Sequence, residues 1–183
     1  MPDTSQNRVH RHRSTAGTVL AILVACTGQQ ANYSSGDAGS SSNTALDSIA
    51  LERTPCFGRC PVYRLRIAGT GAVHFEAASP RSTADTSFSD SISPSAAGAL
   101  LALARAIGFF DLPDEITPAN PDVCGLAATD HPSAIVTIAV GDTLKRVNHY
   151  HGCHAEVDGV YVDAYPRLTA FEAAIDSAAR VVR

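Results

Sequence analysis

The chain has 183 residues, of which 45% are hydrophobic and 17% are charged, and this suits one globular domain of ordinary size plus a polar segment. Its formal net charge is −4, and the body of the chain has no run of lysines or arginines. Binding to a nucleic-acid backbone needs such a run, so we expect no DNA-binding or RNA-binding function.

The first 25 residues have the pattern of an export signal. Arg8, Arg11 and Arg13 precede an uncharged, largely apolar run from residue 14 to residue 25. Twelve residues are too few for a transmembrane helix, which needs about twenty, but they suit the apolar core of a signal peptide. We therefore predict that residues 1–25 are a signal peptide.

The tetrapeptide Leu-Val-Ala-Cys at residues 23–26 resembles the lipobox of bacterial lipoproteins. The resemblance implies that Cys26 is lipidated and becomes the first residue of the mature protein, with a membrane as its partner. Two or three acyl chains would anchor the protein stably, whereas one chain alone is marginal. Thr27 stands where an aspartate would favour the inner membrane, so the resemblance implies an outer membrane facing the periplasm, if the cell has one. A plain secretory signal cleaved elsewhere is the alternative.

Residues 27–44 are mostly serine, glycine, glutamine, asparagine and alanine. Such a composition cannot bury enough apolar surface to become ordered. We predict that residues 26–46 form the lipidated cysteine and a flexible tether, and that residues 47–183 form a single domain.

The domain begins with strand patterns. Ile49 and Leu51 alternate with their neighbours and predict a short first strand. In the next strand, apolar residues lie on one face and Arg64 and Arg66 on the other. A glycine-rich turn and a second alternating segment follow, which predicts a β-hairpin around residues 62–77.

Two amphipathic helices are expected further along the chain. Ser93 and Pro94 are typical of a helix start, and a 3.6-residue apolar stripe predicts a helix over about 94–107. The last helix, over about 164–180, has Leu168, Phe171, Ile175 and Ala178 on one side and charged residues on the other.

Between the helices, residues 134–149 predict a second hairpin. Its first strand, residues 134–140, is almost continuously apolar, which suggests burial on both faces. The order of elements predicts an α+β fold, with an antiparallel sheet of about five to six strands covered by the two helices.

Four cysteines remain besides Cys26, an even number that predicts disulfides in an exported chain. Three pairings are possible. We favour Cys56 with Cys60, which share a tight corner, and Cys124 with Cys153, which stand in loops flanking one hairpin.

An alternative use of the Cys56 and Cys60 pair is thiol-redox chemistry, because Arg59 could favour a thiolate. The pair has three intervening residues, and a proline and a strand follow it, unlike the strand-helix context of thioredoxins.

Another alternative is a zinc or copper site in the segment His149–His154. His149 and His151 share a strand face, and His154 lies nearby, but the spacing matches no strong metal signature. No hydrolase motif or phosphate-binding loop is present, so we assign no catalytic residue and no cofactor, and we expect a domain that is not an enzyme.

The octapeptide Cys-Phe-Gly-Arg-Cys-Pro-Val-Tyr at residues 56–63 resembles the Cys-Phe-Gly-x-Cys-Pro-x-Tyr hallmark of a bacterial family classified only as a domain of unknown function. The similarity covers roughly residues 47–180. The chain departs from the family at Thr70, where members commonly have aspartate, and at Ala77, where they commonly have glycine. The resemblance implies a small extracytoplasmic or lipoprotein-borne domain and brings no established activity.

Together these observations predict an envelope lipoprotein with a non-catalytic binding or scaffolding domain. The protein or small molecule that it binds is not identified by the sequence. The alternative is a metal-binding or thiol-redox protein.

Overall fold

The structure is a computed structural model that describes residues 45–77 and 87–181. The expected signal peptide, Cys26 and residues 26–44 of the expected tether lie outside the described residues. Within the described ranges, no helix is long and apolar enough to cross a membrane.

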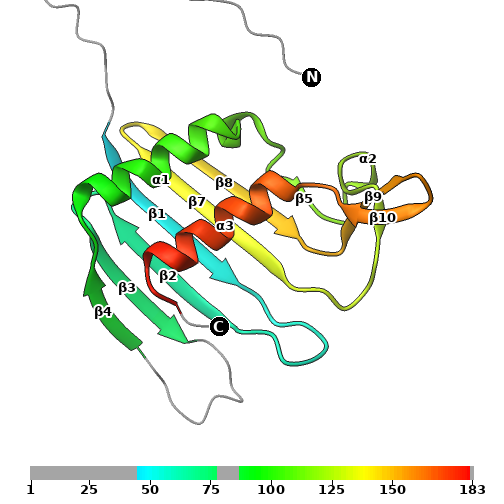
Figure 1. The fold of residues 1–183 in the computed structure, drawn as a ribbon, viewed down its shortest axis with the longest axis horizontal. Coiled ribbons are helices and arrows are strands. Elements are labelled where there is room, and N and C mark those ends of the chain that lie inside the picture. The colour runs from blue at the N-terminus through cyan, green and yellow to red at the C-terminus, as the bar shows by residue number, and fades with distance from the viewer. Residues whose placement is uncertain (1–44, 78–86, 182–183) are drawn as a thin grey trace, which may run out of the picture. The chain divides into compact units, whose positions relative to one another are not determined.

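The described part of the domain is built on a seven-stranded sheet with the strand order β4-β3-β2-β1-β7-β8-β5 (Figure 1). Neighbouring strands are antiparallel except for β5, which pairs with β8 in parallel. The strands are β1 (Leu46–Arg53), β2 (Tyr63–Ala68), β3 (Ala72–Ala77), β4 (Ser87–Ser91), β5 (Glu115–Ile116), β7 (Ser133–Val140) and β8 (Thr143–Tyr150).

Helices α1 (Pro94–Ala106) and α3 (Pro166–Ala178) lie on one face of this sheet (Figure 1). The hydroxyl of Ser93 caps α1 by accepting a 3.1 Å hydrogen bond from the Ala96 N–H, as its position before Pro94 predicts. A 3₁₀ turn, η1 (Phe109–Asp111), follows α1.

A second, three-stranded sheet has the order β10-β9-β6. Its strands are β6 (Leu126–Ala127), β9 (Cys153–Val157) and β10 (Val160–Asp163), and the short helix α2 (Pro121–Cys124) precedes β6. A disulfide between Cys124 and Cys153 joins the end of α2 to the start of β9.

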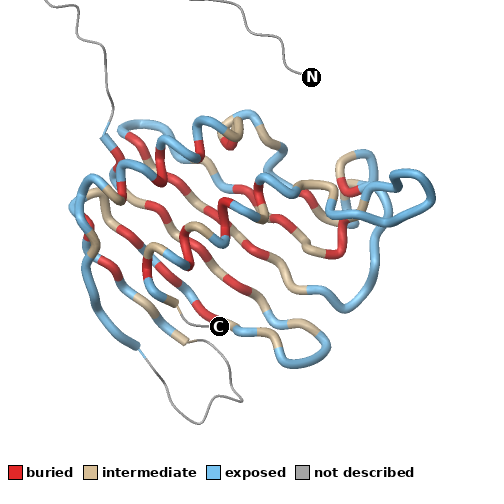
Figure 2. Tube along the Cα trace, in the orientation of Figure 1, coloured by how far each residue is buried: buried red, intermediate tan, exposed pale blue. Residues whose placement is uncertain are grey.

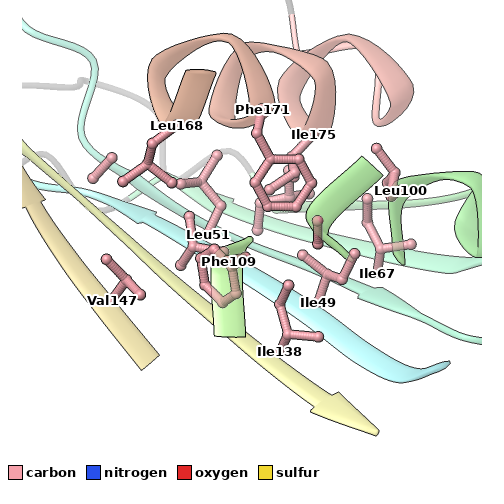
Figure 3. Close-up of a cluster of buried hydrophobic side chains, with 14 of the residues drawn as sticks. Ile49, Leu51, Ile67, Leu100, Phe109, Ile138, Val147, Leu168, Phe171 and Ile175 are labelled. Atoms are coloured by element: carbon pink, nitrogen blue, oxygen red, sulfur yellow. The ribbon is translucent and has the colours of Figure 1, made fainter. Parts of the chain in front are cut away.

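The hydrophobic core lies between the large sheet and the two helices. Inward-facing residues of the central strands, such as Ile49 and Ile138, pack beneath Phe171 and Ile175 of α3 (Figure 3). Phe109 of η1 lies edge-on to Phe171, with ring centroids 5.8 Å apart. Buried positions alternate with more exposed ones along the central strands (Figure 2), so only the inward face of the sheet is fully covered.

The α+β class and the two expected hairpins are present, but the sheet is larger than the five to six strands we expected, and it is mixed. The additional parallel strand, β5, has only two residues, which is too short to produce a periodic pattern. Burial of residues 134–140 on both faces was also a wrong expectation, because Ile135, Thr137 and Ala139 are only half-buried on the face without helices.

Candidate functional site

A row of polar side chains interrupts the apolar inward face of the large sheet. Arg53 on β1 lies opposite Tyr63 on β2 and opposite Ala134 on β7, which in turn lies opposite His149 on β8. Arg53, Tyr63 and His149 are all buried, with exposed fractions of 6%, 2% and 1%. Buried charged residues need partners, and here α3 supplies them.

Glu172 and Asp176 are one turn apart on the buried side of α3. Arg53 donates from Nη1 to Glu172 Oε2 at 3.0 Å and from Nη2 to Asp176 Oδ2 at 2.9 Å. Tyr63 donates its hydroxyl proton to Asp176 Oδ1 at 2.5 Å. One guanidinium and one phenol therefore hold both carboxylates against the sheet.

Two histidines complete what we call the Glu172 cluster, made up of Arg53, Tyr63, His149, His151, Glu172 and Asp176. His149 Nδ1 lies 2.8 Å from Glu172 Oε1, and His151 Nε2 lies 2.8 Å from Glu172 Oε2. Burial alone would raise the pKa of Glu172, but hydrogen bonds to the two histidines, together with their charges, lower it from 4.5 to about 2. Glu172 is therefore ionised at neutral pH and can only accept, so the nitrogen of each ring that faces it donates a proton.

The second nitrogen of His149, Nε2, is buried and has no hydrogen-bond partner among the described residues. The ring of Tyr165 lies edge-on to that of His149, with centroids 5.8 Å apart, and its hydroxyl donates to the Val123 carbonyl at 2.9 Å. Burial raises the pKa of Tyr165, so this hydroxyl remains a proton donor.

Among the residues that the structure describes, a group of potential metal ligands lies in the Glu172 cluster. One ligand atom each from His149, His151 and Glu172 lies within 4.8 Å of the others, a nitrogen and oxygen set that suits zinc. His154, an expected candidate, is not part of this group, because its Nδ1 bonds to the Gly152 carbonyl at 2.9 Å. The Arg53 guanidinium is already paired with the Glu172 carboxylate. Without a metal, the arrangement is therefore a buried, hydrogen-bonded network of ions.

The cysteines pair in the way that the sequence favours, Cys56 with Cys60 and Cys124 with Cys153. The second pair is buried and belongs to the core, whereas the first is half-buried. The first pair closes a small ring that carries Phe57, whose side chain is 88% exposed. Both pairs therefore constrain the backbone.

The outward face of the large sheet, which we call the open face, is covered by no described helix (Figure 1). It contains a depression of about 330 Å³ over β1, β2, β3, β7 and β8. One row of side chains crosses the depression from strand to strand, in the order His74, Arg66, Ala50, Thr137 and Arg146. The small residues in the middle of the row form the floor between longer side chains.

Arginines dominate the charge of the depression. Arg64 is paired with Glu52 at 3.2 Å, and Arg146 is paired with Glu115 at the same distance. The side chain of Arg66, by contrast, makes no hydrogen bond or ion pair with any other described residue. The sequence alternation correctly predicts that Arg64 and Arg66 face away from the core.

A family model described as a domain of unknown function, DUF6438, matches residues 47–175. The chain belongs to the DUF6438 family. The DUF6438 match agrees with the family resemblance predicted from the sequence, and it covers the depression of the open face and every residue of the Glu172 cluster except Asp176. A search of curated proteins found no match to the chain.

Sequence reasoning missed the acidic half of the Glu172 cluster. The sequence predicts that the charged residues of the last helix lie on the side opposite its apolar residues, and this is wrong for Glu172 and Asp176, which are buried. The available signal was Arg53, a charged residue that continues the inward alternation of Ile49 and Leu51 and therefore requires buried acidic partners.

Proposed function

We propose that the protein is an envelope lipoprotein whose DUF6438 domain is a non-catalytic binding module, and that the open face of its large sheet is the binding surface. The observation that carries this proposal is the depression on that face, which has a volume of about 330 Å³. Ligand pockets in proteins are typically about 300 to 1,000 Å³.

The distribution of paired and unpaired charge supports the choice of this face. In the Glu172 cluster, Arg53 is buried and paired with both Glu172 and Asp176, and this arrangement fixes α3 on the sheet. On the open face, Arg66 is exposed and has no partner among the described residues. A surface that binds a charged ligand needs exposed charged side chains that have no partner within the protein, and Arg66 is such a side chain among the described residues.

The expected anchor gives the module its place in the cell. Lipidation at Cys26 and a tether of about twenty residues, with a typical reach of roughly 25 Å, would hold the domain near the membrane, facing the periplasm if the anchor lies in an outer membrane. In that position the open face could capture a ligand of the envelope.

The binding surface can be tested with single tryptophans, because the chain contains none. Glu76→Trp places the probe at the rim of the depression, and Leu103→Trp places it on an exposed position of α1. The mature, lipidated protein is titrated with a detergent extract of envelopes from cells that lack it. We expect a saturable change in emission from the Glu76→Trp protein only. A response from the Leu103→Trp protein alone, or from neither protein, would contradict the proposal.

Metal binding is the second candidate function, and the gathering of His149, His151 and Glu172 favours it. Elemental analysis of the purified protein tests it directly. A metal-binding protein would contain one equivalent of zinc or copper that is lost in His151→Ala and kept in His154→Ala. Protein that contains no metal after dialysis against zinc and, separately, against copper would exclude this candidate.

A further inference from the structure

We propose that the depression of the open face binds a small anion through Arg66 and His74, with the uncharged part of the ligand lying over Ala50 and Thr137. The ligand class is thus a small molecule that carries a carboxylate or phosphate group. This inference rests on the proposed function and specifies the kind of ligand that the open face takes.

The sheet register brings the two anion-binding side chains together. Arg66 on β2 lies opposite His74 on β3, and both are exposed on the open face. Directly opposed residues of antiparallel strands have Cβ atoms about 5 Å apart, so both side chains can reach one anionic group. On the other side of Arg66 lies Ala50, whose methyl group leaves room beside the guanidinium.

The nearby acidic residues leave these two side chains available. Glu52 is paired with Arg64, so two of the charges that line the depression neutralise each other. Glu76 also lies at the rim, where it is directly opposite Arg64 and not Arg66. Neither the Arg66 side chain nor the His74 side chain has a hydrogen-bond or ion-pair partner among the described residues. The guanidinium fork of arginine matches a carboxylate or phosphate group in geometry.

Arg66 and Arg146 lie at opposite sides of the depression. Arg146 is three strands away from Arg66, which at about 4.8 Å per strand is a separation of about 14 Å. Arg146 is also held by Glu115 at 3.2 Å. The proposed anion is therefore bound at Arg66, whose side chain has no such partner among the described residues, and not at Arg146. The space between them, floored by Ala50 and Thr137, is left for an uncharged portion of the ligand.

The test uses three probes of similar shape, namely phenyl phosphate, benzoate and the neutral benzamide. Each is titrated into the isotope-labelled mature protein, and the amide shifts of Ala50, Arg66 and Thr137 are followed by NMR. We expect at least one anion to shift these amides with an affinity about tenfold higher than that of benzamide, since a hydrogen bond to a charged group contributes about this much. The comparison of the two anions shows whether phosphate or carboxylate is preferred.

Arg66→Gln and Arg59→Gln provide a matched pair of variants. Both remove one positive charge from an exposed side chain, but Arg59 lies in the Cys56–Cys60 ring and does not line the depression. We expect Arg66→Gln to weaken binding of the anion about tenfold and Arg59→Gln to leave it unchanged. Equal effects of the two variants would overturn the inference.

The outcomes also separate this inference from the proposed function. If all three probes shift the open face equally, the face binds ligands without selecting anions, and only the inference is wrong. If the probes shift amides of the helices or of the small sheet and leave the open face unchanged, the anion subsite is refuted. The tryptophan experiment then remains the test of whether the open face is a binding surface. If none of the probes shifts any amide, the inference is refuted.

Discussion

Glu172→Gln is the most informative test of the buried network, because it removes a charge while nearly preserving the shape of the side chain. Glu172 accepts hydrogen bonds from Arg53, His149 and His151 at 2.8 to 3.0 Å. Its pKa is lowered from 4.5 to about 2, which corresponds to about 3 kcal/mol of stability at neutral pH. Breaking a buried ion pair by removing one partner costs about 3 to 5 kcal/mol in general, which agrees with this value.

The effect of Glu172→Gln should depend on pH with a defined sign. A carboxyl group whose pKa is lowered by folding stabilises the protein fully above its unfolded pKa, here near 4.5, and this stability is lost as the pH falls towards 2. The difference between the wild-type protein and the variant should therefore be about 3 kcal/mol at pH 7 and should shrink by about 1.4 kcal/mol between pH 7 and pH 3.5.

Urea unfolding followed by circular dichroism at pH 7, 4.5 and 3.5 measures these differences. Glu52→Gln is the control, because the Glu52 and Arg64 side chains are 40% and 63% exposed and such surface pairs contribute less than about 1 kcal/mol. A difference below about 1 kcal/mol for Glu172→Gln at pH 7, or the same difference at pH 7 and pH 3.5, would refute the reasoning.

Three further predictions concern the anchor, the buried disulfide and the phenol of the cluster. Cys26→Ala should move the protein from the membrane fraction to the soluble fraction, and unchanged membrane association would argue against lipidation. Replacing Cys124 and Cys153 with serine should lower the free energy of unfolding by about 3.5 kcal/mol in urea, because that disulfide closes a loop with a sequence separation of 29, and a loss below about 1 kcal/mol would contradict this. Tyr63→Phe removes the hydrogen bond to Asp176 and should cost about 2 kcal/mol in the same assay, so an unchanged midpoint would show that the bond contributes nothing.

Local patterns predict the parts of this fold that local interactions determine. The alternation of apolar and charged residues from Tyr63 to Ala68 correctly places Arg64 and Arg66 outward, and Ser93 correctly marks the start of α1. Local patterns do not predict strand β5, because its two residues pair with β8 only after the intervening chain has folded back.

Local patterns also fail to predict the Glu172 cluster, but for a different reason. Glu172 lies next to Phe171 in the chain, and its burial depends on Arg53, which is 119 positions away in the sequence. Helical periodicity treats a glutamate as an outward residue, since an unpaired buried carboxylate is very unfavourable. Only the sheet register, which places an arginine beneath α3, reverses that preference.

The central position of β1 has a mechanical consequence. The chain enters the described domain at Leu46, and β1 is flanked on both sides, by β2 and by β7. A force applied through the preceding segment, such as a pull against a membrane anchor, therefore acts on a strand held by two hydrogen-bonded ladders that must break together. An edge strand such as β4 could be peeled from one neighbour at a time. The domain is thus pulled through a strand that is held on both sides.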